Sequence, residues 1–119
     1  MPKTNLPLLL NDAIRESEFQ RVVVACARLF GWRVHHTRPA IMRSGRWATP
    51  LQGDAGLPDL ILCKPPRLIF AELKSSKGRV SPEQQTWLSA LAQVPRIEVY
   101  VWRPSDWARV VEILAGDAP

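Results

Sequence analysis

The sequence predicts an α/β fold in which helices flank a central β-sheet that is built around one β-hairpin. Three segments, beginning near residues 12, 81 and 104, carry apolar residues at the three- and four-residue spacing of helices. Between them lie short runs rich in Val, Ile, Leu and Phe, which are typical of strands. Two of these runs, 59–63 and 68–74, are apolar on both faces, so we expect helices to cover both sides of the sheet. The predicted order is helix, strand, hairpin, helix, strand, helix.

Length and composition fit a single domain with one hydrophobic core. The chain has 119 residues, of which 46% are hydrophobic, and we expect one domain over residues 1–119 with a loose leader at 1–12. No apolar run reaches the length of a membrane span, so we expect a cytoplasmic protein. Cys26 and Cys63 lie in apolar runs and lack the spacing of metal ligands, which predicts buried, unreactive thiols.

The charge balance favours an acidic partner such as nucleic acid. Lys and Arg exceed Asp and Glu by five, although ordinary solubility also explains a surplus of this size. The sequence contains no helix-turn-helix, zinc-finger spacing or homeodomain pattern. We therefore expect recognition of DNA backbone and shape, with strong salt dependence, rather than readout of bases.

The first helix is predicted from about Asp12, because its apolar stripe consists of Phe19, Val22, Val23, Cys26, Leu29 and Phe30. Gly31 is expected to end it, since glycine readily adopts the left-handed conformation that follows a helix C-terminus. Residues 32–37 follow as a short strand.

Residues 38–58 form a long connection with three prolines, three glycines and no helical period. Structureless connections of this length are usually functional or mobile. This one contains Arg38, Arg43, Arg46 and Trp47, a mixture of positive charge and aromatic surface that suits contact with a DNA backbone. A solvated loop explains the same residues equally well.

The second half of the chain carries clear helix signals. Ser81 is suited to the N-cap and Pro82 to the first helical position, while Gln84 completes a capping box. The buried stripe of this helix is predicted to be Trp87, Leu88 and Leu91. A strand at 97–102 and a last helix follow; residues 104–106 open that helix, which carries Trp107, Val110, Val111 and Leu114.

The hairpin places chemistry-bearing residues opposite each other. If residues 64–67, Lys-Pro-Pro-Arg, form the turn, Asp59 and Glu72 face each other, with Cβ atoms about 4.5–5.5 Å apart. Lys74 lies two residues beyond Glu72, so strand alternation puts it on the same face. A register slip of one residue would send Asp59 to the opposite face.

Two opposed carboxylates repel, but a divalent cation makes them a binding site, because hard cations such as Mg²⁺ prefer oxygen ligands. The cation can activate water, and a nearby ammonium can stabilise charge in the transition state. Asp59, Glu72 and Lys74 therefore predict phosphodiester hydrolysis. A turn aspartate and a solvated Glu-x-Lys strand face are the structural alternatives. The apolar run 68–71 that precedes Glu72 fits a solvated face poorly.

These residues lie in a recognisable pattern. Residues 56–62, GLPDLIL, and 71–74, AELK, resemble the signature of PD-(D/E)xK nucleases, and residues 78–84, GRVSPEQ, with 87–88, WL, resemble the VRR-NUC family. The resemblance extends from about residue 16 to residue 114. It implies a restriction-endonuclease-like fold with a mixed central sheet, dependence on Mg²⁺ or Mn²⁺, and DNA cleavage. Stand-alone members of the family come from phages and bacteria, and Holliday junctions and other branched DNA are their expected substrates.

The resemblance also implies further site residues. An acid on the first helix helps to bind the metal; Glu16 matches the family's acid–apolar–Gln pattern with Phe19 and Gln20, while Glu18 remains the alternative. Gln84 and His36 match family positions, although capping explains the former and a structural or phosphate-binding role the latter. The metal would be held by Asp59, Glu72 and Glu16, together with the carbonyl of Leu73. Lys77 and Arg79 are candidates for phosphate contact or are simply solvated loop charges.

The sequence thus predicts a metal-dependent, structure-specific DNA endonuclease acting on branched DNA, in the cytoplasm of a bacterium or a phage-infected host. The alternatives are a nickase, a flap or restriction-type nuclease, and a catalytically idle DNA-binding module of the same fold. An intact Asp59, Glu72 and Lys74 set argues against the idle module. Because a junction resolvase makes two symmetric cuts, a homodimer is expected if that substrate is the true one.

Overall fold

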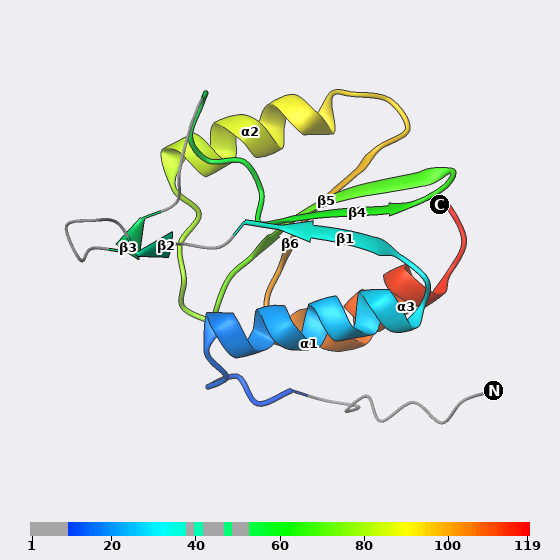
Figure 1. Cartoon of the computed structure of the whole chain (residues 1–119), viewed down its shortest axis with the longest axis horizontal. Helices are drawn as coiled ribbons and strands as arrows, with labels where there is room; N and C mark the ends of the chain where they lie inside the picture. Colours follow the sequence, from blue (N-terminus) through cyan, green and yellow to red (C-terminus); the bar gives the residue numbers. More distant parts are fainter. Residues whose placement is uncertain (1–9, 38–39, 42–46, 49–52) are drawn as a thin grey trace.

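The computed structural model describes residues 10–37, 40–41, 47–48 and 53–119, and it has the predicted α/β architecture (Figure 1). A four-stranded sheet has the strand order β1-β4-β5-β6, and a separate two-stranded ribbon consists of β2 and β3. The elements are α1 (Glu16–Leu29), β1 (Arg33–His36), β2 (Ala40–Ile41), β3 (Trp47–Ala48), β4 (Leu60–Lys64), β5 (Arg67–Leu73), α2 (Pro82–Ala92), β6 (Glu98–Trp102), the 3-10 turn η1 (Pro104–Asp106) and α3 (Trp107–Ala115).

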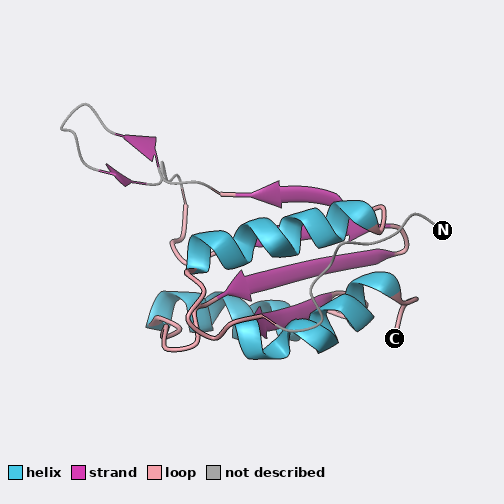
Figure 2. Ribbon diagram, turned by 90° about the horizontal axis from the view of Figure 1, so that it is seen from below, coloured by secondary structure: helices cyan, strands magenta, loops and turns pink. Residues whose placement is uncertain are grey.

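The main sheet is mixed, as expected. Strands β1, β4 and β5 are antiparallel, whereas β6 runs parallel to β5 after the crossover through α2. Helices α1 and α3 cover one face of the sheet, and α2 lies on the other (Figure 1, Figure 2). This three-layer arrangement is the restriction-endonuclease-like fold that the sequence predicts.

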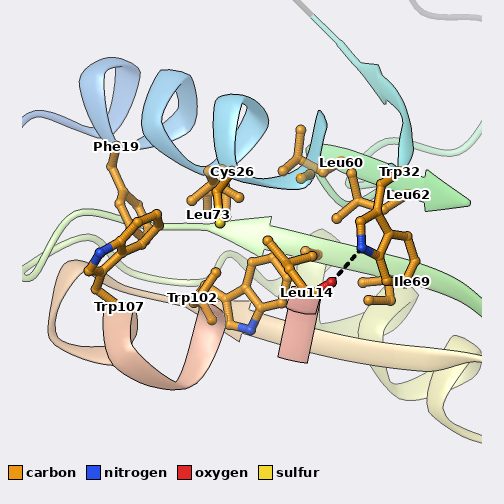
Figure 3. Packing of buried hydrophobic residues seen from close by; sticks show 14 residues of the cluster. Phe19, Cys26, Trp32, Leu60, Leu62, Ile69, Leu73, Trp102, Trp107 and Leu114 are labelled. Atoms are coloured by element: carbon orange, nitrogen blue, oxygen red, sulfur yellow. Dashed lines mark hydrogen bonds between the residues drawn. The ribbon is translucent and has the colours of Figure 1, made fainter. Parts of the chain in front are cut away.

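The core lies mainly on the α1/α3 side (Figure 3). There, Leu60, Leu62, Ile69, Ala71 and Leu73 are fully buried against helical residues of the same cluster. The apolar residues on the opposite face of the hairpin are only half-buried, because α2 is 11 residues long and packs chiefly on β6. Helices therefore lie on both sides of the sheet, as expected, and the larger hydrophobic core is on the α1/α3 side.

Helix α1 begins at Glu16, four residues later than predicted, and its buried residues are Phe19, Val23, Cys26 and Ala27. Of the predicted stripe, Leu29 is 44% exposed, whereas Val22 and Phe30 are half-buried and pack against the core. Gly31 has φ +88°, which confirms its role after the helix C-terminus. Burial raises the pKa of the Cys26 thiol to about 11, in keeping with an unreactive core residue, whereas Cys63 is half-buried.

The turn of the hairpin is shorter than predicted. Lys64 and Arg67 pair as the last residues of the two strands, so that only Pro65 and Pro66, joined by a cis peptide bond, form the turn. The predicted register is nevertheless confirmed, because shortening the turn symmetrically keeps Cys63 opposite Leu68. Residues 38–58, which were predicted to lack secondary structure, contain the antiparallel ribbon of β2 and β3. Each of its strands has two residues, which is too short for an alternation of apolar and polar residues to be recognised in the sequence.

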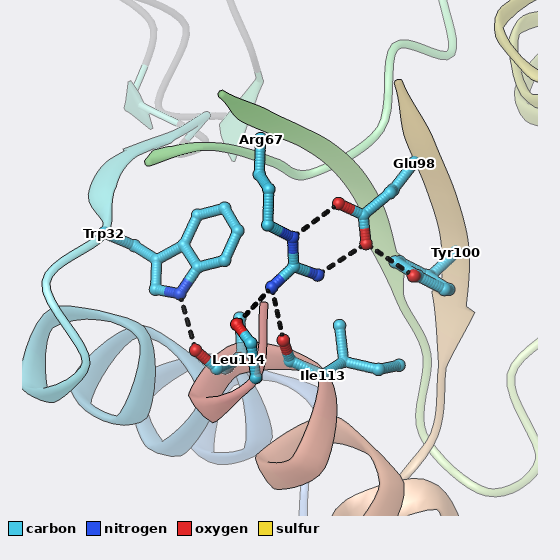
Figure 4. Close-up of polar contacts among 7 residues, drawn as sticks. Trp32, Arg67, Glu98, Tyr100, Ile113 and Leu114 are labelled. Carbon is cyan, nitrogen blue, oxygen red and sulfur yellow. Dashed lines mark hydrogen bonds and ion pairs between the residues drawn. The ribbon is translucent and has the colours of Figure 1, made fainter. Parts of the chain in front are cut away.

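Arg67, which the sequence placed in the hairpin turn, is the first residue of β5, and its buried side chain links the sheet to α3 (Figure 4). Its side chain is 6% exposed and donates two hydrogen bonds, of 2.8 and 2.6 Å, to the carboxylate of Glu98. Nη1 donates to the carbonyls of Ile113 and Gly116, and the guanidinium lies over the ring of Trp32. Trp32 Nε1 in turn donates to the Leu114 carbonyl. The end of α3 is thus held to the closed end of the hairpin.

Helix α2 begins as predicted. Ser81 Oγ accepts a hydrogen bond from the backbone N–H of Gln84, and the Ser81 backbone N–H donates to Gln84 Oε1, which together form a capping box. Of its predicted apolar stripe only Leu88 is buried, while Trp87 and Leu91 are half-buried. In the last helix, Trp107, Val110 and Leu114 are buried as predicted. Among the described residues, no helix is long and apolar enough to cross a bilayer.

Candidate active site at the open end of the hairpin

Asp59 and Glu72 meet where the two central strands begin to separate. The last pair of the β4–β5 ladder is Leu60 with Ala71, so the next position places Asp59 opposite Glu72, as the sequence predicts. Asp59 Oδ2 accepts a hydrogen bond of 3.0 Å from the backbone N–H of Leu73. Its own carbonyl accepts one of 3.3 Å from the Thr37 N–H, so Asp59 is tied to both neighbouring strands. The carboxylate is therefore held in place by backbone groups.

The side chain of Glu72 is almost completely buried, with 1% of its surface exposed. The pKa of Glu72 is raised to about 8, and burial of the side chain is the largest cause. The neighbouring Asp59 raises this pKa further, because it shares a hydrogen bond with the protonated form of Glu72 and because its negative charge disfavours the ionised form. Lys74 acts in the opposite direction. Glu72 Oε1 accepts a hydrogen bond of 3.1 Å from Gln84 Nε2, whereas no described residue donates a hydrogen bond to Glu72 Oε2. One oxygen of a buried carboxylate thus lacks a donor.

Lys74 completes the group. Its Nζ atom lies 3.9 Å from Glu72 Oε1, and its side chain is 12% exposed. Lys74 follows the last residue of β5, but its backbone N–H donates to the Trp102 carbonyl and so continues the pairing with β6. The strand alternation that the sequence suggested therefore holds beyond the end of the strand.

Gln84 has two roles that the sequence left as alternatives. Its Oε1 accepts the capping hydrogen bond from Ser81, while its Nε2 donates to Glu72. A primary amide carries both an acceptor and two donors, so one side chain can close the helix end and orient the buried acid at once. The start of α2 is thereby linked to the carboxylate pair.

Glu16, the first residue of α1, belongs to the same electrostatic environment. Partial burial, followed by the charge of Asp59, raises the pKa of Glu16; Lys74 and the backbone amide of Ser75 act against them. Glu18 is exposed. In the part of the chain that the structure describes, however, no three Asp, Glu, His or Cys side chains gather closely enough to hold a metal ion by themselves. Glu16 thus lies near the pair of acids without joining it in a ready cluster.

Comparison with known proteins matches this geometry to one family. A model of the VRR-NUC domain matches residues 12–106, most of the chain and all of the residues just described. The chain belongs to the VRR-NUC family. It is therefore a nuclease domain of the PD-(D/E)xK superfamily. No curated protein and no solved structure matches the chain.

In this VRR-NUC domain, Gly56 lets the loop before Asp59 approach the start of α2. Its φ is +101°, and a Cβ atom built there would lie 2.5 Å from the carbonyl carbon of Glu83 and 2.7 Å from the backbone nitrogen of Gln84. Trp87 Nε1 donates to the carbonyl of Asp54, which holds the same loop on α2. The sequence contained the glycine but did not show which backbone it would touch.

Replacing Gly56 by Ala is expected to destabilise the VRR-NUC domain by about 2–3 kcal/mol and to reduce nuclease activity, because the methyl group would push the Asp59 loop away from Gln84. Gly53→Ala is the matched control: its φ is +117°, but nothing lies within 4 Å of the new Cβ. Urea denaturation of both variants measures the difference. Equal losses of stability in the two variants would show that the positive φ alone accounts for the effect, and not the contact between the new methyl group and the start of α2.

Arg103 supports the other side of the site and was not predicted. Its Nη1 atom donates to the carbonyls of Ser75 and Gly78, at 2.7 and 2.6 Å, and so pins the loop that follows Lys74. The backbone N–H of Arg103 is held by Asp106 Oδ2. No motif in the sequence marks this contact, because an arginine after a strand is common and its partners lie at least 25 residues away.

The remaining predicted residues lie around the VRR-NUC site or outside the described chain. His36 is paired with Leu60 at the end of β1, beside the residue that bonds Asp59. Lys77 and Arg79 are exposed in the loop after Lys74, and Lys77 lines a recess of about 620 Å³ together with Glu16. Arg38, Arg43 and Arg46, together with the side chain of Trp47, lie outside the described residues, so their predicted contacts with DNA remain predictions.

Proposed function

We propose that this VRR-NUC domain is a metal-dependent, structure-specific endonuclease that hydrolyses phosphodiester bonds in DNA, with branched DNA such as Holliday junctions as substrate. The observation that carries the proposal is the buried carboxylate of Glu72 facing Asp59, with the ammonium of Lys74 beside it. Such a group of charges contributes nothing to folding that apolar residues would not provide better. The two facing carboxylates suit a divalent cation, and the neighbouring ammonium suits a phosphate.

The residues fit Mg²⁺ or Mn²⁺. Glu72 Oε2 is buried and receives no hydrogen bond from the described residues, and hard divalent cations prefer such carboxylate oxygens. Mg²⁺ commonly uses only one or two carboxylates and keeps several waters, so a pair of close acids is sufficient. Asp59 and Glu72 would provide these ligands, with Glu16 and the Leu73 carbonyl as the additional ones. When bound, the ion supplies Lewis acidity and lowers the pKa of a coordinated water.

The side chains of the chain itself have separate tasks in this proposal. Lys74 orients the attacking water or stabilises the additional negative charge on the phosphate in the transition state. Gln84 keeps the Glu72 carboxylate in place because its Nε2 donates to Glu72 Oε1, which leaves Glu72 Oε2 available. Because a four-way junction is cut symmetrically on two strands, we further propose that the active form is a twofold homodimer. Such an enzyme would act in the cytoplasm of a bacterium or a phage-infected host cell, where the DNA lies.

The proposed function is tested with purified protein and labelled four-way, flap, nicked and linear DNA, each incubated with Mg²⁺, Mn²⁺ or EDTA. We expect cleavage with either cation, preferentially of the four-way junction, and only background with EDTA, because Asp59 and Glu72 would then face each other without a counter-ion. An Asp59→Asn preparation controls for contaminating nucleases. Undiminished cutting in EDTA would rule out metal dependence, and cleavage of linear DNA at the same rate would rule out preference for branched DNA.

A further inference from the structure

We propose that a groove along α1 binds the backbone of the DNA strand adjacent to the scissile phosphate. The groove has a volume of about 490 Å³ and is lined by Ser17, Gln20, Arg21, Val24, Ala25, Arg28 and His36; we call it the α1–β1 groove. This inference rests on the proposed nuclease function, because it assigns to the same substrate a second contact surface. None of the sequence patterns singled out Arg21 or Arg28.

The groove runs along one flank of the helix. Its α1 residues recur at three- and four-residue intervals and therefore lie on one side, next to the side on which Phe19 and Val23 are buried. Arg21 and Arg28 are seven residues apart, which corresponds to two turns and about 10.5 Å along the axis. One strand of B-DNA advances about 3.4 Å per nucleotide along the duplex axis and also winds around it, so the two guanidinium groups are spaced to reach phosphates about one or two nucleotides apart.

Both walls of the groove lead to the carboxylate pair. On the helical side, Ser17 directly follows Glu16, whose pKa is affected by Asp59 and Lys74. On the strand side, His36 precedes Thr37, whose backbone N–H donates to the Asp59 carbonyl. A strand lying in the groove would therefore continue toward the point where hydrolysis is proposed to occur.

The charge of the groove favours a polyanion. Arg21 and Arg28 are exposed, and none of the residues that line the groove is acidic. Within the described chain neither arginine forms an ion pair with a carboxylate, and the segments outside it contain no Asp or Glu. Ser17 and Gln20 add hydrogen-bond donors, while Val24 and Ala25 offer apolar contact to sugars. This set of groups recognises the backbone without selecting bases.

The test compares Arg21→Gln/Arg28→Gln with Arg96→Gln/Arg109→Gln, a control that removes the same charge from exposed positions outside the groove. Binding to the four-way junction is measured in EDTA from 50 to 200 mM KCl. Each lost phosphate contact should reduce the magnitude of the slope of log affinity against log salt concentration by about 0.9. For the groove variant, this slope should therefore fall in magnitude by about 2, and the affinity for the junction should fall about tenfold. The control should change little. With Mg²⁺, the groove variant should show a raised KM and an almost unchanged kcat.

A second measurement locates the contact. Neutral methylphosphonate linkages are introduced singly along the cleaved strand, and a linkage at a contacted phosphate should weaken binding of the unmodified protein but not of the groove variant. If the protein cuts DNA but both double variants bind and cut alike, the groove assignment is wrong and the nuclease proposal stands. If the unmodified protein neither binds nor cuts any DNA, the proposed function fails and the groove assignment fails with it.

Discussion

Glu72→Gln is expected to abolish DNA cleavage while raising the stability of the metal-free protein. Cleavage should fall by at least about a thousandfold, because in the proposed function Glu72 binds the metal ion, and its loss would remove several kcal/mol of charge stabilisation in the transition state. The amide should retain the hydrogen bond that Glu72 Oε1 accepts from Gln84, and it can donate one to the carboxylate of Asp59. The variant should therefore be more stable than the wild-type protein although it no longer cleaves DNA.

The gain in stability should depend on pH with a definite sign. The ordinary pKa of glutamate is 4.5, and in the folded protein the pKa of Glu72 is raised to about 8 by burial and by Asp59. Between these values the folded protein holds a proton that the unfolded chain releases, so the wild-type protein loses stability as pH rises from 4.5 toward 8. The amide side chain of the Glu72→Gln variant has no proton to lose. The difference in Tm between variant and wild type should thus be larger at about pH 8 than at about pH 5.

Calorimetric or fluorescence melting in EDTA measures this difference, with Glu112→Gln as the exposed control on α3. DNA binding by the Glu72→Gln variant in EDTA should remain close to wild type, which separates chemistry from substrate recognition. Lys74→Ala should likewise lose cleavage and keep DNA binding. A Glu72→Gln protein that melts lower than wild type at about pH 8, or that still cuts DNA, would contradict the proposed roles of this carboxylate.

Arg67→Ala is expected to lower the free energy of unfolding by about 3–5 kcal/mol, because it leaves the Glu98 carboxylate, whose side chain is 10% exposed, and the carbonyls of Ile113 and Gly116 without their donor. The aromatic face of Trp32 also loses its cation. Urea denaturation followed by circular dichroism gives the value. The effect should be among the largest of any single substitution outside the apolar core.

Two further variants show whether the unpaired charge is responsible. Arg67→Met/Glu98→Gln removes both charges and keeps the acceptor for the hydroxyl of Tyr100, so it should recover part of the loss. Arg109→Ala, on the exposed side of α3, should change stability by less than about 0.5 kcal/mol. If Arg67→Ala were as mild as Arg109→Ala, the buried network would not contribute to holding α3 on the sheet.

The facing pair of carboxylates could be predicted from the sequence because a β-hairpin is a local structure. Once the turn is placed near Pro65 and Pro66, the alternation of strand residues decides which side chains face each other, and the error in turn length left the register unchanged. Asp59, Glu72 and Lys74 lie within 16 consecutive residues. The capping box of α2 was equally local, since Ser81 and Gln84 are three residues apart.

Residue type and local period thus determined the α/β class, the order of elements and the carboxylates at the open end of the hairpin. Only the tertiary structure decided that Arg67 is buried against Glu98, that Gln84 also bonds Glu72, and that Gly56 touches the start of α2. Those contacts join segments 12 to 31 residues apart, and their geometry follows from how α2 and β6 fold back on the hairpin. A period in the sequence tells which face of a strand or helix is apolar, whereas the partner of a polar side chain depends on which distant backbone is brought to it.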